Sequence, residues 1–303
     1  MTLPHAALTP SGTNLWIDTG RRSAIALKNL IDKDIKTKDI LTSKAFENAM
    51  IVHAACGGST NLILHLPAVA HAIKENIMKV EDWIRINKLT PRLVDVLPNG
   101  PKGFPTSVFF SSGGVPEVML KLRNEGLLNL DVITSTGLTL NENLDWWEQS
   151  EKRDFVRRQL RNTRNIDPED VVHSLKNSKK KNMTSTVTFP KGNISPEGSV
   201  VKSTAIDKTV IDEDGVYRKI GPARIFISEA DAIKAVKDKG ENGVKAGDVM
   251  VIVCGGPKGT GMQEVAQITI ALKYLSYGKE VALITDGRFS GVSTGACIGH
   301  IGP

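Results

Sequence analysis

The sequence predicts an α/β protein of two domains, and three observations carry this prediction. With 303 residues, of which 40% are hydrophobic and 24% charged, the chain has the size and composition of a soluble globular protein with two cores. Apolar residues recur at helical spacing in the first half, whereas short β-like segments alternate with turns in the second. Between the halves, residues 174–185 are polar, basic and nearly free of large apolar side chains. They predict a linker, and we expect one domain over residues 1–180 and another over 181–303.

The first half is expected to be mainly helical. Thr42 and Ser43 are good capping residues for a helix whose apolar stripe includes Phe46 and Met50. One strand is expected at residues 92–97. The other predicted helices lie at residues 20–34, 80–87, 113–127 and 143–164.

The second half is expected to form a smaller α/β or β-barrel-like domain, because short apolar segments in it are bounded by turn residues. The predicted strands lie at residues 185–189, 200–203, 223–227, 249–253 and 281–284. Two helices are predicted among them, at residues 229–239 and 263–277.

A glycine-rich turn in the first half has the composition of an anion site. Gly57 and Gly58 precede Ser59, Thr60 and Asn61, and an apolar helical run follows them. Free N–H groups and the positive end of a helix dipole favour negative ligands at such a turn, and the hydroxyls add donors. Simple N-capping by Ser59 or Thr60 explains the same residues without a ligand.

The end of the last predicted strand is a second candidate site. The strand at residues 281–284 runs into Asp286, Gly287, Arg288, Phe289, Ser290 and Gly291. Small residues at a strand end let the backbone approach a ligand closely. Ser290 there has the chemistry of a nucleophile, of a base for proton transfer or of a hydroxyl that binds substrate. The alternative is a glycine-rich turn that only reverses the chain.

A third glycine-rich stretch, GGPKGTGMQE at residues 255–264, lacks the spacing of a nucleotide phosphate loop. Glu264 at its end is predicted to begin the following helix. Its carboxylate oxygens suit a divalent cation, although an acidic residue at a helix N-terminus also favours the helix dipole.

Composition excludes several other classes of function. Cys56, Cys254 and Cys297 are far apart in the sequence and form no CxxC pair, so neither a disulfide framework nor a zinc site is indicated and a reducing cytoplasm fits best. The net charge of +6 is modest and its basic runs lack interleaved aromatic residues, which argues against a nucleic-acid surface. No apolar run reaches membrane-spanning length, and the N-terminus does not resemble a signal peptide.

Several long motifs in order give the sequence a family resemblance. ALITDGRFSGVSTGACIGHIGP resembles the signature of the dihydroxy-acid and sugar-acid dehydratase (IlvD/Edd) family. ENAMIVHAACGGSTNLILHLPAVAHAI, GNISPEGSVVKSTAID, GPARIFISEADAI and GDVMVIVCGGPKGTGMQE match the same family. The form SGVSTGACIGH is most similar to the sugar-acid branch, of the D-xylonate dehydratase kind. The resemblance implies the later half of the family's N-terminal α/β domain and the start of its β-barrel-like, swivelling α/β C-terminal domain.

The resemblance also implies a reaction and roles for the candidate residues. The family consists of hydro-lyases, so we expect dehydration of an aldonate such as D-xylonate to a 2-keto-3-deoxy acid. Glu264 matches a Mg²⁺ ligand, Ser290 matches the proposed base, and the substrate-binding residues would be Ser59, Thr60 and Asn61. In the family an iron–sulfur cluster withdraws the 3-hydroxyl, and complete members are expected to form dimers or tetramers.

The sequence departs from the family in ways that keep other hypotheses open. Cys56, Cys254 and Cys297 do not match the cluster ligands, so we expect none of the iron–sulfur ligands in this chain. The family motifs that carry those ligands and the remaining Mg²⁺ ligands are not matched here, so the chain resembles an internal fragment that we expect to be inactive alone. The alternatives are a dihydroxy-acid dehydratase of branched-chain amino-acid synthesis and a non-catalytic fragment or subunit.

Overall fold

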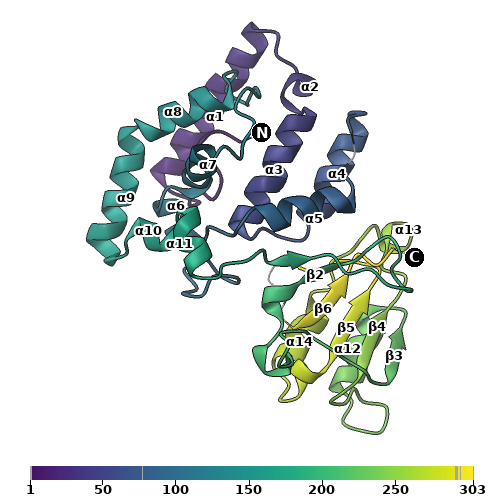
Figure 1. The fold of residues 1–303 in the computed structure, drawn as a ribbon. Coiled ribbons are helices and arrows are strands. Elements are labelled where there is room, and N and C mark those ends of the chain that lie inside the picture. Colours follow the sequence, from purple (N-terminus) through teal and green to yellow (C-terminus); the bar gives the residue numbers. More distant parts are fainter. Residues whose placement is uncertain (1, 77, 291–292, 294, 303) are drawn as a thin grey trace. The chain divides into compact units, whose positions relative to one another are not determined.

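The computed structural model describes residues 2–76, 78–290, 293 and 295–302, and within it the chain forms two compact units (Figure 1). The first unit contains residues 1–57, 66–78 and 85–185, and the second contains residues 58–65, 79–84 and 186–303. The chain therefore passes between the units more than once, and two short segments of its first half fold with the second unit.

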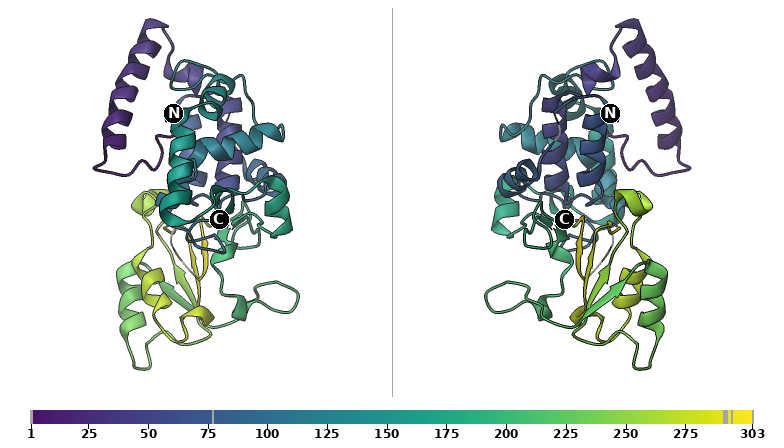
Figure 2. Two further views of the ribbon diagram at one scale, coloured as in Figure 1. Left: turned by 90° about the vertical axis from the view of Figure 1, so that its left-hand side faces the viewer. Right: turned by 90° about the vertical axis from the view of Figure 1, so that its right-hand side faces the viewer.

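Helices make up the first unit, and capping residues define several of their ends. The Thr13 hydroxyl accepts a hydrogen bond from the Trp16 amide at the start of α1, and Thr42 caps α3 in the same way, as predicted. The core of this unit includes the fully buried Trp147 and Leu122. Figure 2 shows α1, in dark purple, at the margin of the unit. The helices before the first strand are α1 (Asn14–Asp32), α2 (Thr37–Ile40), α3 (Ser43–Cys56), α4 (Leu62–Ala72), α5 (Val80–Leu89), α6 (Thr106–Ser111), α7 (Gly114–Asn124), α8 (Leu140–Glu148), α9 (Glu151–Arg164), α10 (Pro168–Val171) and α11 (Leu175–Lys180).

A six-stranded sheet organises the second unit, in the order β1-β2-β6-β5-β4-β3. Strands β3, β4, β5 and β6 are parallel to one another, whereas the β1–β2 and β2–β6 pairs are antiparallel. Helices α12 and α14 pack against the sheet, and their apolar faces bury Met250 and Leu283 completely. The predicted α/β class is confirmed. The elements are β1 (Val187–Thr188), β2 (Val200–Lys202), β3 (Ala223–Phe226), α12 (Glu229–Lys237), β4 (Val249–Ile252), α13 (Pro257–Thr260), α14 (Gln267–Lys273), β5 (Ala282–Thr285) and β6 (Ala296–Gly299), with single 3₁₀ turns at Ser203–Ala205, Lys208–Val210 and Gly278–Glu280.

The segment predicted as a linker is folded, so that prediction is wrong for residues 174–185. It contains α11, whose Leu175 is buried and whose N-cap Ser174 accepts from the Asn177 amide. The Ser178 hydroxyl donates to the Arg92 carbonyl. Met183, just after α11, is buried as well, and its carbonyl accepts from the Arg92 amide at 3.2 Å. Two apolar residues and one buried hydroxyl therefore dock a short basic helix whose lysines stay in solvent.

Three other predicted elements differ from the structure. The strand expected at residues 92–97 forms only isolated bridges, Val94 with Val172 and Val96 with Phe104. The helix expected at residues 143–164 is two helices, because Ser150 stops α8 and caps α9. The helix expected from residue 263 begins only at Gln267.

In the described part of the chain, no helix is both long enough and apolar enough to cross a membrane.

Candidate active site

The carboxyl ends of β4 and β5 bring two glycine-rich segments of the second unit together. Parallel neighbouring strands end at the same edge of the sheet, which is where α/β folds usually bind ligands. The Gly255 amide donates to the Asp286 carboxylate at 2.9 Å. A Cβ on Gly287 would lie 3.1 Å from the Gly255 carbonyl oxygen, so a larger residue would push the two segments apart.

Ser290 lies in the segment that returns from the end of β5 to the start of β6. The Ser290 carbonyl accepts from the Ser293 amide at 3.0 Å, and the Ser293 hydroxyl lies 3.1 Å from the Thr269 hydroxyl. Its neighbours Gly291, Val292 and Thr294 are outside the described residues. The Ser290 residue itself is half-buried.

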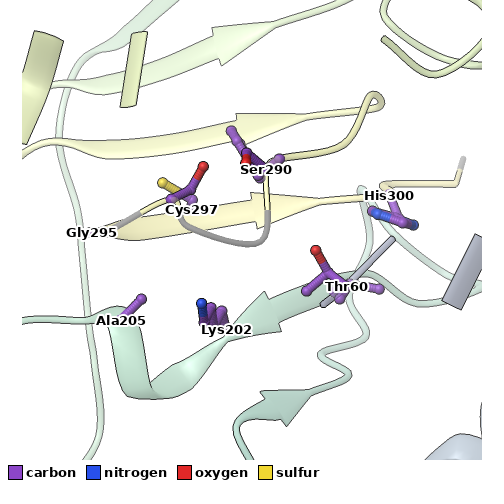
Figure 3. A pocket seen from close by; sticks show the side chains of 10 residues that line it. Thr60, Lys202, Ala205, Ser290, Gly295, Cys297 and His300 are labelled. Atoms are coloured by element: carbon purple, nitrogen blue, oxygen red, sulfur yellow. The ribbon is translucent and has the colours of Figure 1, made fainter. Parts of the chain in front are cut away.

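A narrow recess of about 20 Å³, partly open to solvent, is lined by the Ser290 side chain. In Figure 3 the side chains of Ser290 and Cys297 lie across the recess from those of Thr60 and Lys202. The lining is polar at several points, with three hydroxyls, an amine and an imidazole. The lining residues are Thr60, Val200, Lys202, Ala205, Phe289, Ser290, Ser293, Gly295, Cys297 and His300.

The register of β2 on β6 explains why Lys202 reaches this recess. Val200 pairs with Gly299 and Val201 pairs with Ile298, so Lys202 comes opposite Cys297. Side chains alternate between the faces of a sheet, which puts Lys202 and Cys297 on one face. Burial lowers the pKa of the Lys202 ammonium to about 8, and burial raises the pKa of the Cys297 thiol to about 12.

His300 follows β6 directly and has an unusual backbone conformation with φ of 55°. Its amide donates to the Gly287 carbonyl at 2.7 Å, which ties the end of β6 to the segment after β5. Burial, assisted by the nearby Arg288 cation, lowers the pKa of the imidazole to about 4. The ring is therefore neutral at pH 7, and its buried Nε2 has no hydrogen-bond partner within the described chain.

The structure separates the three residues of the glycine-serine-threonine-asparagine turn. Thr60 is buried and lines the recess with Ser290. Ser59 is exposed and its hydroxyl accepts from the Asn61 amide at 3.2 Å, which closes the turn. The Asn61 side-chain amide donates to the Glu264 carboxylate, and its buried Oδ1 has no partner among the described residues.

Glu264 does not begin a helix, contrary to the sequence prediction. It forms a β-bridge with Arg288, and the next residue, Val265, donates its amide to the Arg288 carbonyl at 2.8 Å. The Arg288 guanidinium donates to the Met262 carbonyl at 2.6 Å and lies 2.8 Å from His65 Nε2. The helix-dipole explanation of Glu264 is therefore wrong, because the carboxylate precedes α14 by a full turn.

The candidate residues thus form two groups. Thr60 and Ser290 share the recess, whereas Asn61 and Glu264 contact each other and are not among its lining residues. Sequence reasoning missed Lys202 and His300. Both lie inside motifs that resemble those of the family. The available signal was an ionisable residue, which follows a glycine in the case of His300 and ends an apolar strand in the case of Lys202.

The oxygen donors of the second group suit a hard divalent cation. Glu264 offers a carboxylate, and the unpartnered Asn61 Oδ1 is a buried carbonyl oxygen. Carboxylate and amide oxygens are the ligands that Mg²⁺ prefers. Within the described residues, however, no three His, Cys, Asp or Glu side chains gather as a complete metal site.

Comparison with known proteins identifies relatives along the whole chain. Residues 1–143 match the family model described as dihydroxy-acid/6-phosphogluconate dehydratase N-terminal, and residues 170–303 match its C-terminal counterpart. The D-xylonate dehydratases YagF and YjhG of Escherichia coli strain K12 are 56% and 58% identical over 100% of this chain, which corresponds to 46% of each relative. A dihydroxy-acid dehydratase of Picrophilus torridus is 38% identical over 98% of this chain and 49% of its own length. The chain therefore spans about half the length of the curated relatives it matches.

Proposed function

Because the chain belongs to the dihydroxy-acid/6-phosphogluconate dehydratase family, we propose that it is part of a hydro-lyase that dehydrates a sugar acid such as D-xylonate to a 2-keto-3-deoxy acid. The observation that carries the proposal is the recess that gathers Ser290, Thr60, Lys202 and His300. A sugar acid is a polyhydroxylated anion. Hydroxyls and a neutral imidazole suit its hydroxyl groups, and a half-buried ammonium suits its carboxylate.

In the proposed reaction Ser290 removes the proton from C2 of the substrate. The electron pair left at C2 forms a double bond to C3, and the 3-hydroxyl takes a proton from solvent and leaves as water. The resulting enol then tautomerises to the ketone by gaining a proton at C3 and losing one from its hydroxyl. Thr60 and His300 Nε2 would hold hydroxyl groups of the substrate. Lys202 would hold the carboxylate, and its positive charge would favour the deprotonated form of Ser290.

Glu264 and Asn61 would hold Mg²⁺, since both present oxygen atoms. When bound, Mg²⁺ would supply Lewis acidity that makes the C2 proton easier to remove. Ser59 is exposed, and we propose for it only a role at the entrance, through hydroxyl contacts with substrate.

An iron–sulfur cluster is held by several cysteine thiolates, and Cys56, Cys254 and Cys297 belong to no group of three His, Cys, Asp or Glu side chains among the described residues. We keep as a proposal that this chain supplies none of the family's cluster ligands. A domain boundary at residues 180 and 181, a cytoplasmic location and a homo-oligomeric complete enzyme are likewise proposals.

The test is turnover in a chimera that joins this chain to the parts of a D-xylonate dehydratase that it does not span. We expect release of a 2-keto-3-deoxy acid from D-xylonate at a kcat/KM at least tenfold above that for a branched-chain 2,3-dihydroxy acid. Preference for the branched-chain substrate would instead support the dihydroxy-acid dehydratase alternative. The observation in favour of that alternative is the 38% identity to the Picrophilus enzyme. A folded chimera that converts neither would favour the non-catalytic alternative.

A further inference from the structure

A second polar cluster lies in the first unit, where the N-terminal segment meets α1, α8 and α9. The His5 ring stacks on Phe110 with 4.1 Å between ring centres and lies 4.6 Å from the Trp147 ring. The Arg22 guanidinium of α1 lies 5.2 Å from the centre of the Trp146 ring. Burial lowers the pKa of His5, and the cations of Lys152, on the first turn of α9, and of Arg22 lower it further. The cluster therefore joins two cations, one imidazole and three aromatic rings from five parts of the chain.

Three hydrogen-bond donors of this cluster are buried and unpaired within the described chain: Arg22 Nη1, Lys152 Nζ and Trp147 Nε1. None of these groups can act as an acceptor at neutral pH, so they cannot satisfy one another. A buried donor without a partner normally costs free energy, and a buried cation costs more. His5 Nδ1 is the one unpaired acceptor of the cluster among the described residues, so three unpaired donors stand against one acceptor.

The charges of the cluster do not balance either. Asp18 is the one carboxylate in ion-pair range of Lys152 among the described residues, and its Oδ2 lies 4.0 Å from Nζ, beyond hydrogen-bond distance. Arg22 has no ion-pair partner in the described chain, and its Nη2 reaches only the Pro4 carbonyl at 3.5 Å. The next residue after Lys152 behaves differently, because Arg153 donates two hydrogen bonds to Glu117. One positive charge therefore remains uncompensated at Arg22 and Lys152.

The position of Lys152 on α9 adds to the positive potential. α9 contains 14 residues, and Lys152 is its second residue, where the helix dipole is positive. Glu151 and Asp154 share this first turn, but neither is in ion-pair range of Lys152 among the described residues. His5 contributes no charge, because burial lowers its pKa to about 4, and its Nε2 lies 2.9 Å from the Phe110 carbonyl. That contact places the proton on Nε2 and leaves the unpartnered Nδ1 as an acceptor.

We propose that Arg22, Lys152 and Trp147 form a binding site for an oxyanion, a phosphate or a carboxylate group, that accepts hydrogen bonds from all three. A phosphate monoanion also carries an O–H group that can donate to His5 Nδ1, which makes inorganic phosphate the first probe. The oxyanion has two possible sources, a free ion or an acidic side chain of a polypeptide. The inference does not depend on the dehydratase reaction.

The experiment measures the melting temperature of the 303-residue chain at pH 7 and constant ionic strength while potassium phosphate, or potassium acetate, replaces potassium chloride. The variants are Arg22→Gln and Lys152→Met. The matched controls are Arg21→Gln and Arg158→Gln, which remove exposed arginines from the same two helices. We expect phosphate to raise the melting temperature of the wild type and both controls. The apparent Kd should be at least tenfold weaker in Arg22→Gln and Lys152→Met.

The comparison of phosphate with acetate distinguishes the two sources. A clear preference for phosphate supports a free phosphorylated ligand, whereas equal or stronger binding of acetate supports an acidic side chain. Equal shifts in all five proteins, or no shift of the wild type relative to chloride, would overturn the site. If a variant does not fold, ³¹P line broadening of phosphate by the wild type decides, and a line width unchanged by the protein contradicts the proposal.

Discussion

In the ion network around Glu117 in the first unit, the buried polar groups have partners. In the recess around Ser290 in the second unit, a buried polar group lacks one among the described residues. Glu117 is only 2% exposed, and its carboxylate contacts Arg153 at 2.8 Å and Arg157 at 3.2 Å. Arg157 also contacts Glu169 at 2.7 Å, so each charge has a partner. In the recess, by contrast, His300 Nε2 is buried without a partner in the described chain.

This difference distinguishes buried polar groups that stabilise the fold from those that are available to bind a ligand. Paired charges hold their own helices together, and nothing remains for a ligand to satisfy. The unpartnered imidazole nitrogen lies beside hydroxyls and a half-buried ammonium. Its burial costs folding free energy unless a ligand forms a hydrogen bond with it. Substitutions in the two regions should therefore change different quantities.

The largest effect is expected for Ser290→Ala, measured as kcat in the chimera described above. Loss of a positioned base typically lowers a rate by about 10²–10⁴, while a neutral hydroxyl contributes only about 0.5–1.5 kcal/mol to binding. KM for D-xylonate and the free energy of unfolding should change little. Exchange of the C2 proton with solvent deuterium should be lost in parallel with turnover. Near-normal turnover in Ser290→Ala would show that this serine only forms the turn.

The opposite pattern is expected for Glu117→Gln. This substitution removes the carboxylate partner of the half-buried Arg153 and leaves the buried Arg157 with Glu169 alone, and breaking a buried pair typically costs about 3–5 kcal/mol. Urea denaturation of the chain should show this loss, whereas Glu125→Gln, an exposed position just after the same helix, should be nearly neutral. A loss below about 1 kcal/mol would mean that the network contributes little to stability.

A smaller effect is expected for Glu264→Gln, which should weaken Mg²⁺ binding without unfolding the chain. Removing a group that orients or ligates a metal typically lowers its affinity by about 10–100-fold. Titration calorimetry with Mg²⁺ measures the change, and Glu280→Gln, in the 3₁₀ turn before β5, is the control. Equal Mg²⁺ affinity in both variants would remove Glu264 from the proposed ligand set.

The smallest and most specific effect is a pH dependence of D-xylonate binding that comes from Lys202. The pKa of its ammonium is about 8 in the free protein, and a bound carboxylate would raise it. Above pH 8 binding then requires proton uptake, so affinity should fall by up to about tenfold per pH unit, and it should be constant between pH 6 and 7. Calorimetric titration of wild type and Lys202→Arg tests this, since arginine stays charged and should abolish the fall. The same fall in Lys202→Arg would assign the titration to another group.

Local patterns were sufficient to predict most of the fold. Thr42 and the apolar stripe behind it marked α3, and the valine-rich segment before Cys254 marked β4. The linker prediction failed because α11 is held by the apolar side chains of Leu175 and Met183 and by the Ser178 hydroxyl, and none of these shows in composition. Strand β6 was not predicted, because Ala296 and Gly299 have little β propensity and depend on β5 and β2 for partners.

The candidate site was predictable only in part, and for a related reason. Ser290, Thr60, Asn61 and Glu264 stand in glycine-rich motifs that can be read locally, although their roles came from the family resemblance and stay predictions. Lys202 could not be found in this way, since its position in the recess depends on the register between β2 and β6. Register is a long-range property that a single strand does not encode.

The contact between Asn61 and Glu264 also has a consequence for synthesis of the protein in the cell. The two residues are 203 positions apart, and both belong to the second unit. At about 5–20 residues per second, a ribosome needs about 10–40 s to proceed from Asn61 to its partner Glu264. During that time residues 58–61 lack the rest of the second unit, although α3 before them and α4 after them can already fold. We expect residues 58–61 to become protected only after Glu264 has been made, and to be a site where chaperones bind during translation.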